Sequence, residues 1–122
     1  DERVFVLLRD AFTQARDVMH AYRKVVSKCA EPRDILQHVP FWTKQLRYTQ
    51  LLVEGHFAPL QEYLREQPLN VISVNVIQTL SDLLDAAHLV VDKRTIDFVI
   101  QLVATICETI QGPSTGNQDC LI

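Results

Sequence analysis

The chain has 122 residues, of which 48% are hydrophobic and 22% are charged, so it is about as long as one domain and too apolar to be a disordered tail. Its apolar runs last only a few residues, far short of the roughly 20 that a membrane-spanning helix needs. The net charge of −3 with dispersed basic residues argues against nucleic-acid binding, and the three cysteines, which form no Cys-x-x-Cys pair, indicate a reducing environment.

The first predicted element is a long amphipathic helix over residues 1–31. Apolar residues recur in steps of three and four from Leu8 to Cys29, and most of the charged residues fall off this stripe. We treat residues 1–31 as one segment and residues 32–122 as a second helical region that begins at Pro32.

The middle of the chain predicts two shorter helices after a turn near residues 33–38. Pro40 suits the first turn of a helix over residues 40–54, and Gly55 would end it. Pro59 likewise suits the first turn of a helix over residues 59–67.

Residues 69–111 contain neither glycine nor proline and predict two longer helices. The first, over 70–91, has a candidate cap at Asn70; its β-branched start also fits a strand, but the helical spacing that continues to Ala87 favours a helix. The second, over 92–111, has a candidate cap at Asp92 or Thr95.

Gly112-Pro113 ends the second of these helices, and residues 117–122 look like the start of another, so we expect a piece cut from a longer protein. The two helices are expected to be antiparallel and to share one core. In it, Ile77, Leu80 and Leu84 of the first helix would pack against Ile100, Val103 and Ile106 of the second.

These elements predict an all-α fold of antiparallel helices. The pair over 70–111 spans about the 40–47 residues of one armadillo- or HEAT-type unit. No consensus repeat recurs, so the helical pattern alone leaves a solenoid fragment and a compact bundle both open.

The chemistry-bearing residues do not predict an enzyme. There is no Gly-rich phosphate loop, no Gly-x-Ser-x-Gly and no His-Glu-x-x-His. The histidines and cysteines also lack the spacing of a transition-metal site.

Two glutamates occupy unfavourable positions. Glu54 directly precedes Gly55 at the end of one predicted helix, and Glu108 lies in the last turn of another. A carboxylate there faces the negative end of the helix dipole, which costs a few tenths to about 1 kcal/mol. Two such glutamates, if they converge, suit a hard cation such as calcium; the alternative is two exposed side chains screened by water.

Two sequence motifs resemble the RIH-associated region of ryanodine and inositol trisphosphate receptors. Residues 50–67 resemble a leucine-rich helix that ends in Cys-Glu-Gly-His or Cys-Glu-Asn-His, followed by Gln-x-Tyr/Phe-Leu-Arg-x-Gln. Residues 108–118 resemble Glu-Tyr-x-Gln-Gly-Pro-Cys-x-x-Asn-Gln. The resemblance covers roughly residues 46–122, and its variants are more similar to ryanodine receptors. Val53 and Ser114 replace the two family cysteines, and the stretch between the motifs is short.

The resemblance implies a segment of the helical core solenoid, on the cytosolic face of the endoplasmic or sarcoplasmic reticulum membrane, in a homotetrameric channel. It implies that Glu54 and Glu108 are ligands of the activating calcium ion and that His56 and Gln111 support them. A third ligand, a backbone carbonyl, would come from the channel's C-terminal domain, so the isolated chain should bind calcium weakly or not at all.

The hypothesis is therefore a regulatory, non-catalytic segment in which calcium binding is coupled to the pore. The competing hypothesis is a helical scaffold that binds a peptide or protein partner without sensing calcium.

Overall fold

The computed structural model describes residues 3–28, 35–55, 58–111 and 114–121, and these residues form six α-helices and no strand. The all-α prediction is confirmed. Residues 29–34, with Cys29 among them, lie outside the described part, as do 56–57 and 112–113. The helices are α1 (Arg3–Ser27), α2 (Val39–Val53), α3 (Ala58–Arg65), α4 (Val76–Ala87), α5 (Ile96–Ile110) and α6 (Thr115–Asp119), with a short 3-10 turn, η1 (His88–Val90), after α4.

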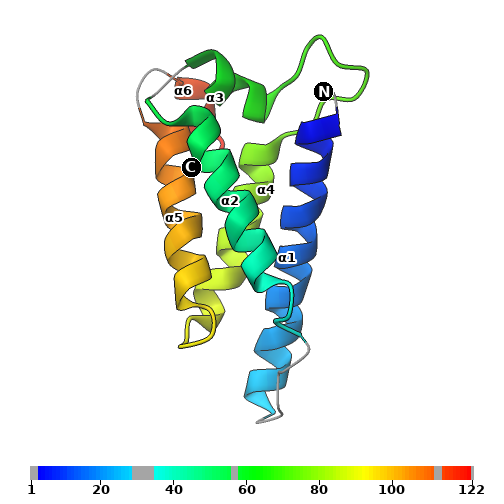
Figure 1. Cartoon of the computed structure of the whole chain (residues 1–122), viewed down its shortest axis with the longest axis vertical. Helices are drawn as coiled ribbons and strands as arrows, with labels where there is room; N and C mark the ends of the chain where they lie inside the picture. Colours follow the sequence, from blue (N-terminus) through cyan, green and yellow to red (C-terminus); the bar gives the residue numbers. More distant parts are fainter. Residues whose placement is uncertain (1–2, 29–34, 56–57, 112–113, 122) are drawn as a thin grey trace.

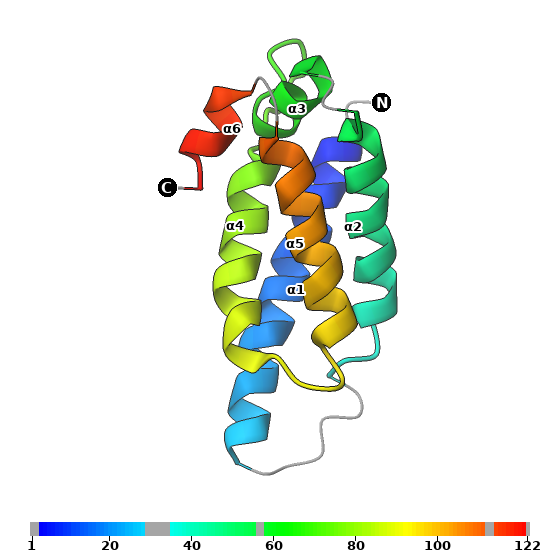
Figure 2. The same ribbon diagram turned by 90° about the vertical axis from the view of Figure 1, so that its left-hand side faces the viewer.

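The four longest helices form two antiparallel hairpins, α1–α2 and α4–α5, that stack on each other (Figure 1, Figure 2). The most extensive contacts join α1 to α4 and α2 to α5, and within each of these pairs the helices run in the same direction. Successive repeats of an α-solenoid stack in this way, whereas neighbours in a simple up-and-down bundle alternate in direction. The arrangement therefore favours the solenoid interpretation.

One hydrophobic core lies between the two hairpins. Each helix contributes side chains spaced three or four residues apart, as an amphipathic helix requires. The largest contributors are Phe12, Met19 and Tyr22 from α1, Trp42 and Leu46 from α2, Leu80 and Leu83 from α4, and Phe98 and Leu102 from α5.

The buried face of α5 differs from the predicted one. Ile106 is buried, but Ile100 is 59% exposed and Val103 43% exposed, so the expectation that both pack in the core is wrong. Thr105 lies in the core instead, where the single proton of its hydroxyl has two acceptors within hydrogen-bond distance, the backbone carbonyls of Gln101 (2.8 Å) and Leu46 (3.0 Å). A buried hydroxyl with such partners loses little on leaving water, so hydrophobicity alone misplaced the face of α5.

The segment before α4 is irregular and was wrongly predicted as helix from residue 70. Gln67 is fully buried and holds this segment: its Nε2 donates to the carbonyl of Val74 (2.9 Å), and its Oε1 accepts from the N–H of the same residue (2.7 Å). The cap of α4 is Asn75, whose side chain accepts from the N–H of Gln78, and Asn70 is not the cap. The Gln67 contacts therefore hold residues 70–75 in an irregular segment, and α4 begins at Val76 and not at the predicted residue 70.

The turn between α4 and α5 is fastened to α1 by a buried tyrosine. The hydroxyl of Tyr22 donates to Asp92, and the other carboxylate oxygen accepts from the N–H groups of Arg94 and Thr95. Burial and the hydrogen bond to Asp92 raise the pKa of Tyr22. Burial alone would raise the pKa of Asp92, but the hydrogen bonds that it accepts outweigh this effect and hold its pKa below the usual value.

Candidate functional site

Glu54 lies at the point where α2 stops. It is the C-cap of α2, with an extended backbone, and Gly55 follows with φ +89°. A Cβ added to Gly55 would meet nothing within 4 Å. Glycine is therefore favoured here by the positive φ, and not by a lack of room for a side chain. Asparagine is the other residue that tolerates positive φ, which agrees with the Glu-Gly-His and Glu-Asn-His variants of the motif. The sequence here therefore encodes an abrupt helix end with an exposed glutamate.

Glu108 lies in the last turn of α5, at the same end of the stack as Glu54. Because α2 and α5 are adjacent and parallel, their C-terminal ends point in one direction (Figure 2). Neither helix has a basic residue in its last turn. The negative ends of two helix dipoles and two carboxylates thus occur at one end of the fold, which favours a bound cation.

The end of α5 is closed by side-chain amides. The carbonyls of a helix's last turn lack intrahelical partners and need others. Here the carbonyl of Glu108 accepts from Gln61 Nε2 (2.9 Å), that of Thr109 from Asn117 Nδ2 (2.9 Å), and that of Ile110 from Gln118 Nε2 (2.7 Å). We call Gln61, Asn117 and Gln118 the amide clasp. It joins α3 and α6 to the end of α5.

Two further contacts fix α6 against α3. Arg65 donates to Asn117 Oδ1 (3.0 Å), and Asn117 Nδ2 also donates to the carbonyl of Gln61 (2.8 Å). A Cβ on Gly116 would lie 2.1 Å from the Arg65 guanidinium, so only glycine lets the arginine cross α6 in this position. Arg65 and Gly116 therefore belong to the same junction as the amide clasp.

Of the four residues that the resemblance assigns to the site, three are described. Glu54 and Glu108 end neighbouring helices, and Gln111 is the C-cap of α5, with its N–H donating to Cys107 and its carbonyl accepting from Gln61 (2.8 Å). His56 lies outside the described residues. Within the described part of the chain, no three His, Cys, Asp or Glu side chains form a group that could hold a metal.

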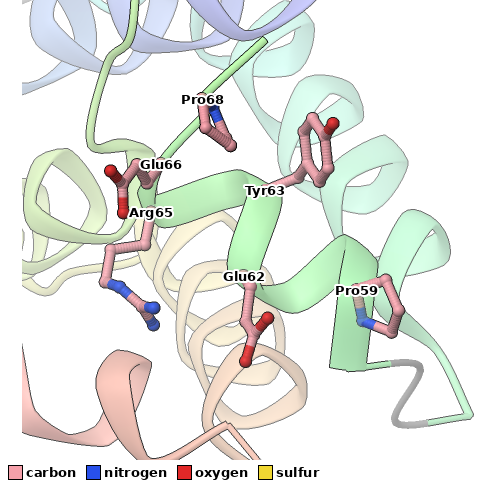
Figure 3. A pocket seen from close by; sticks show the side chains of 6 residues that line it. All are labelled: Pro59, Glu62, Tyr63, Arg65, Glu66 and Pro68. Atoms are coloured by element: carbon pink, nitrogen blue, oxygen red, sulfur yellow. The ribbon is translucent and has the colours of Figure 1, made fainter.

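A separate small pocket of about 200 Å³ lies along α3, and it contains neither glutamate of the candidate site (Figure 3). Its lining residues are Pro59, Glu62, Tyr63, Arg65, Glu66 and Pro68. Arg65 extends from this pocket toward α6, in agreement with its bond to Asn117. The pocket shares only Arg65 with the junction described above.

Sequence reasoning missed the amide clasp, although its members stand in the two quoted motifs. The motifs contain these two glutamines and the asparagine, but roles were assigned only to Glu54, Glu108, His56 and Gln111. The signal that was available is the spacing: Gln61 follows Glu54 by seven residues, and Asn117-Gln118 lies a few residues beyond the Gly112-Pro113 break that ends the predicted helix.

The sequence matches the model of one protein family. The model of the family described as RyR and IP3R Homology associated matches residues 36–122. The chain belongs to this RIH-associated family. The family is a region of the ryanodine and inositol trisphosphate receptor channels, so the chain is a segment of that channel family and not of an enzyme family. The match includes α2 to α6 and both motifs.

No solved structure matches the chain. None of the helices in the described part has the length and apolar character needed to cross a membrane.

Proposed function

We propose that this RIH-associated chain is a cytosolic regulatory segment of a tetrameric calcium-release channel of the endoplasmic or sarcoplasmic reticulum, and that Glu54 and Glu108 hold its activating calcium ion. The observation that carries the proposal is the parallel placement of α2 and α5, which brings both glutamates to one end of the stack with no basic residue in either last turn. Family membership supports the same pair, because both lie within the matched region.

The residues present fit calcium in part. Calcium takes roughly six to eight oxygen ligands, and two carboxylates supply at most about four. A backbone carbonyl from the channel's C-terminal domain and water would supply the remaining oxygens. His56 and Gln111 would orient the two carboxylates. When bound, calcium would link this segment to that domain, and the link would bias the pore toward opening.

The test is single-channel opening of the full-length channel as a function of cytosolic calcium. Glu54→Gln and Glu108→Gln keep the side-chain shape and remove the charge that holds a divalent ion. Each should raise the half-activating calcium concentration by at least about tenfold, equal to about 1.4 kcal/mol of binding free energy, while the tetramer still assembles.

Glu62→Gln and Glu66→Gln are matched controls. Both glutamates are exposed on or just after α3, which lies at the end of the stack where α2 and α5 finish (Figure 1), so each variant removes one charge there and leaves Glu54 and Glu108 in place. We expect a shift below about twofold from either, because exposed charges are screened by salt. Unchanged activation in both Glu54→Gln and Glu108→Gln would refute the calcium proposal and favour the helical scaffold.

A second measurement uses the isolated chain. Because the shell is incomplete without the C-terminal domain, calcium titration of the isolated chain should give weak or unmeasurable binding. Tight binding that survives Glu54→Gln would show that the ion binds elsewhere.

A further inference from the structure

Gln61 makes an unusual set of contacts for a buried glutamine. Its side chain is fully buried, and its single amide nitrogen donates to two backbone carbonyls of the same turn, those of Glu108 (2.9 Å) and Gln111 (2.8 Å). Both of these residues belong to the candidate calcium site. One amide from α3 thus holds the two ends of the turn that carries Glu108.

The other half of the same amide is left without a partner. Gln61 Oε1 is buried and accepts no hydrogen bond from any residue that the structure describes. A buried acceptor without a donor destabilises a fold, so such atoms are uncommon and require an explanation. The orientation of the amide explains the unpaired oxygen: the nitrogen faces the carbonyls of Glu108 and Gln111, so the oxygen faces the other way.

We propose that Gln61 is a positioning residue of the calcium site, which fixes the last turn of α5 so that the Glu108 carboxylate is held ready for the ion. This inference rests on the proposed function and goes beyond the four residues that the resemblance assigns. It also gives α3 and α6 a role, because the amide clasp joins both helices by hydrogen bonds to the turn that carries Glu108.

Gln67 provides a matched control within the same segment. It is equally buried and also donates from its amide nitrogen to two carbonyls, those of Tyr63 and Val74, but these bonds hold the segment before α4 and not the last turn of α5. Gln61→Met and Gln67→Met both replace an amide with an apolar side chain of similar length. A purely structural role for Gln61 predicts that the two variants behave alike.

The first measurement needs no calcium. Hydrogen exchange of the backbone N–H of Gln111, which bonds to Cys107, reports the opening of the last turn of α5. We expect Gln61→Met to speed this exchange about tenfold more than Gln67→Met does. Equal rates in the two variants would overturn the positioning role. If Gln61→Met does not fold, Gln118→Met takes its place, because Gln118 is only partly buried and donates to the neighbouring carbonyl of Ile110.

The second measurement is calcium activation of the full-length channel. Gln61→Met should raise the half-activating concentration by about tenfold, as is typical when a group that orients a metal ligand is lost, and Gln67→Met should leave it unchanged. If Glu108→Gln shifts activation but Gln61→Met shifts it no more than Gln67→Met, the inference fails and the proposed function stands. If neither glutamate variant shifts activation, the proposed function fails, and the inferred positioning of a calcium ligand fails with it.

Discussion

Gly55 allows the sharpest test of the turn that places Glu54. Its φ of +89° lies where L residues are strained, and an added Cβ would touch nothing within 4 Å. The effect of a substitution is therefore conformational, with no steric contribution from neighbours. A left-handed conformation costs an L residue about 1–2 kcal/mol, so Gly55→Ala should lower the free energy of unfolding by about 1 kcal/mol.

Two companion variants separate backbone strain from other effects. Gly55→Asn should cost less than Gly55→Ala, because asparagine tolerates positive φ. Replacement of Gly55 by D-alanine, introduced by chemical ligation, places the methyl group where positive φ is favourable. It should raise the free energy of unfolding by about 0.4–1 kcal/mol, because it restricts only the unfolded chain.

Urea denaturation followed by circular dichroism measures all three differences. The expected order of stability is D-alanine, glycine, asparagine and L-alanine, from highest to lowest. Equal stability of the L- and D-alanine proteins would refute the reasoning, because it would mean that the turn does not require a left-handed residue after Glu54.

Three further outcomes can be checked on the same chain by denaturation. Ile106→Ala should cost about 2–5 kcal/mol because it leaves a cavity, whereas Ile100→Ala, at an exposed position, should cost under about 0.5 kcal/mol. Ser114→Ala should stabilise the fold by about 1 kcal/mol, because the buried Ser114 hydroxyl has no partner among the described residues. Because the fold lowers the pKa of Asp92, the ionised carboxylate stabilises the fold at pH values above its unfolded pKa of about 4. This stabilisation is lost as the pH falls from there through the folded pKa. The free energy of unfolding of Asp92→Asn should therefore decrease less steeply in acid than that of the unmodified chain. Equal acid limbs in the two proteins would show that the titration of Asp92 does not contribute to the loss of stability in acid.

Much of the fold was predictable because glycine and proline mark where helices stop. The helix predicted over 40–54 is α2 (Val39–Val53), and the one predicted over 59–67 is α3 (Ala58–Arg65). In both cases a proline in the first turn and a break after the last turn are local signals that depend on backbone geometry alone.

The errors arose where a polar side chain replaces local propensity. The segment 70–75 has the spacing of a helix, but Gln67 bonds to Val74 from seven residues away, and no periodicity reports such a contact. The face of α5 was misplaced for a related reason, since Thr105 is buried through bonds to carbonyls on two helices. Hydrophobic patterning treats such residues as surface residues.

The candidate site was only partly predictable. Glu54 and Glu108 were found because a carboxylate at a helix C-terminus is unfavourable, and this signal is present in the sequence. That the two helices are parallel neighbours was not predictable from periodicity, because it depends on how one hairpin stacks on the other. The motif resemblance supplied the pairing that local physics left open.

The choice of amides to close α5 has an electrostatic consequence. A lysine or arginine near the end of a helix also satisfies the last carbonyls, and its charge interacts favourably with the dipole. Such a residue beside Glu108 would at the same time compensate the carboxylate and weaken its attraction for a free cation. Gln61, Asn117 and Gln118 satisfy the carbonyls of the last turn with neutral donors. These three donors add no positive charge of their own, and the Arg65 guanidinium at the same junction bonds to Asn117 Oδ1 (3.0 Å) instead of to a carbonyl of α5. In the proposed site, neutral donors would therefore leave the attraction of the Glu108 carboxylate for a divalent ion less compensated than a lysine or arginine in their place would.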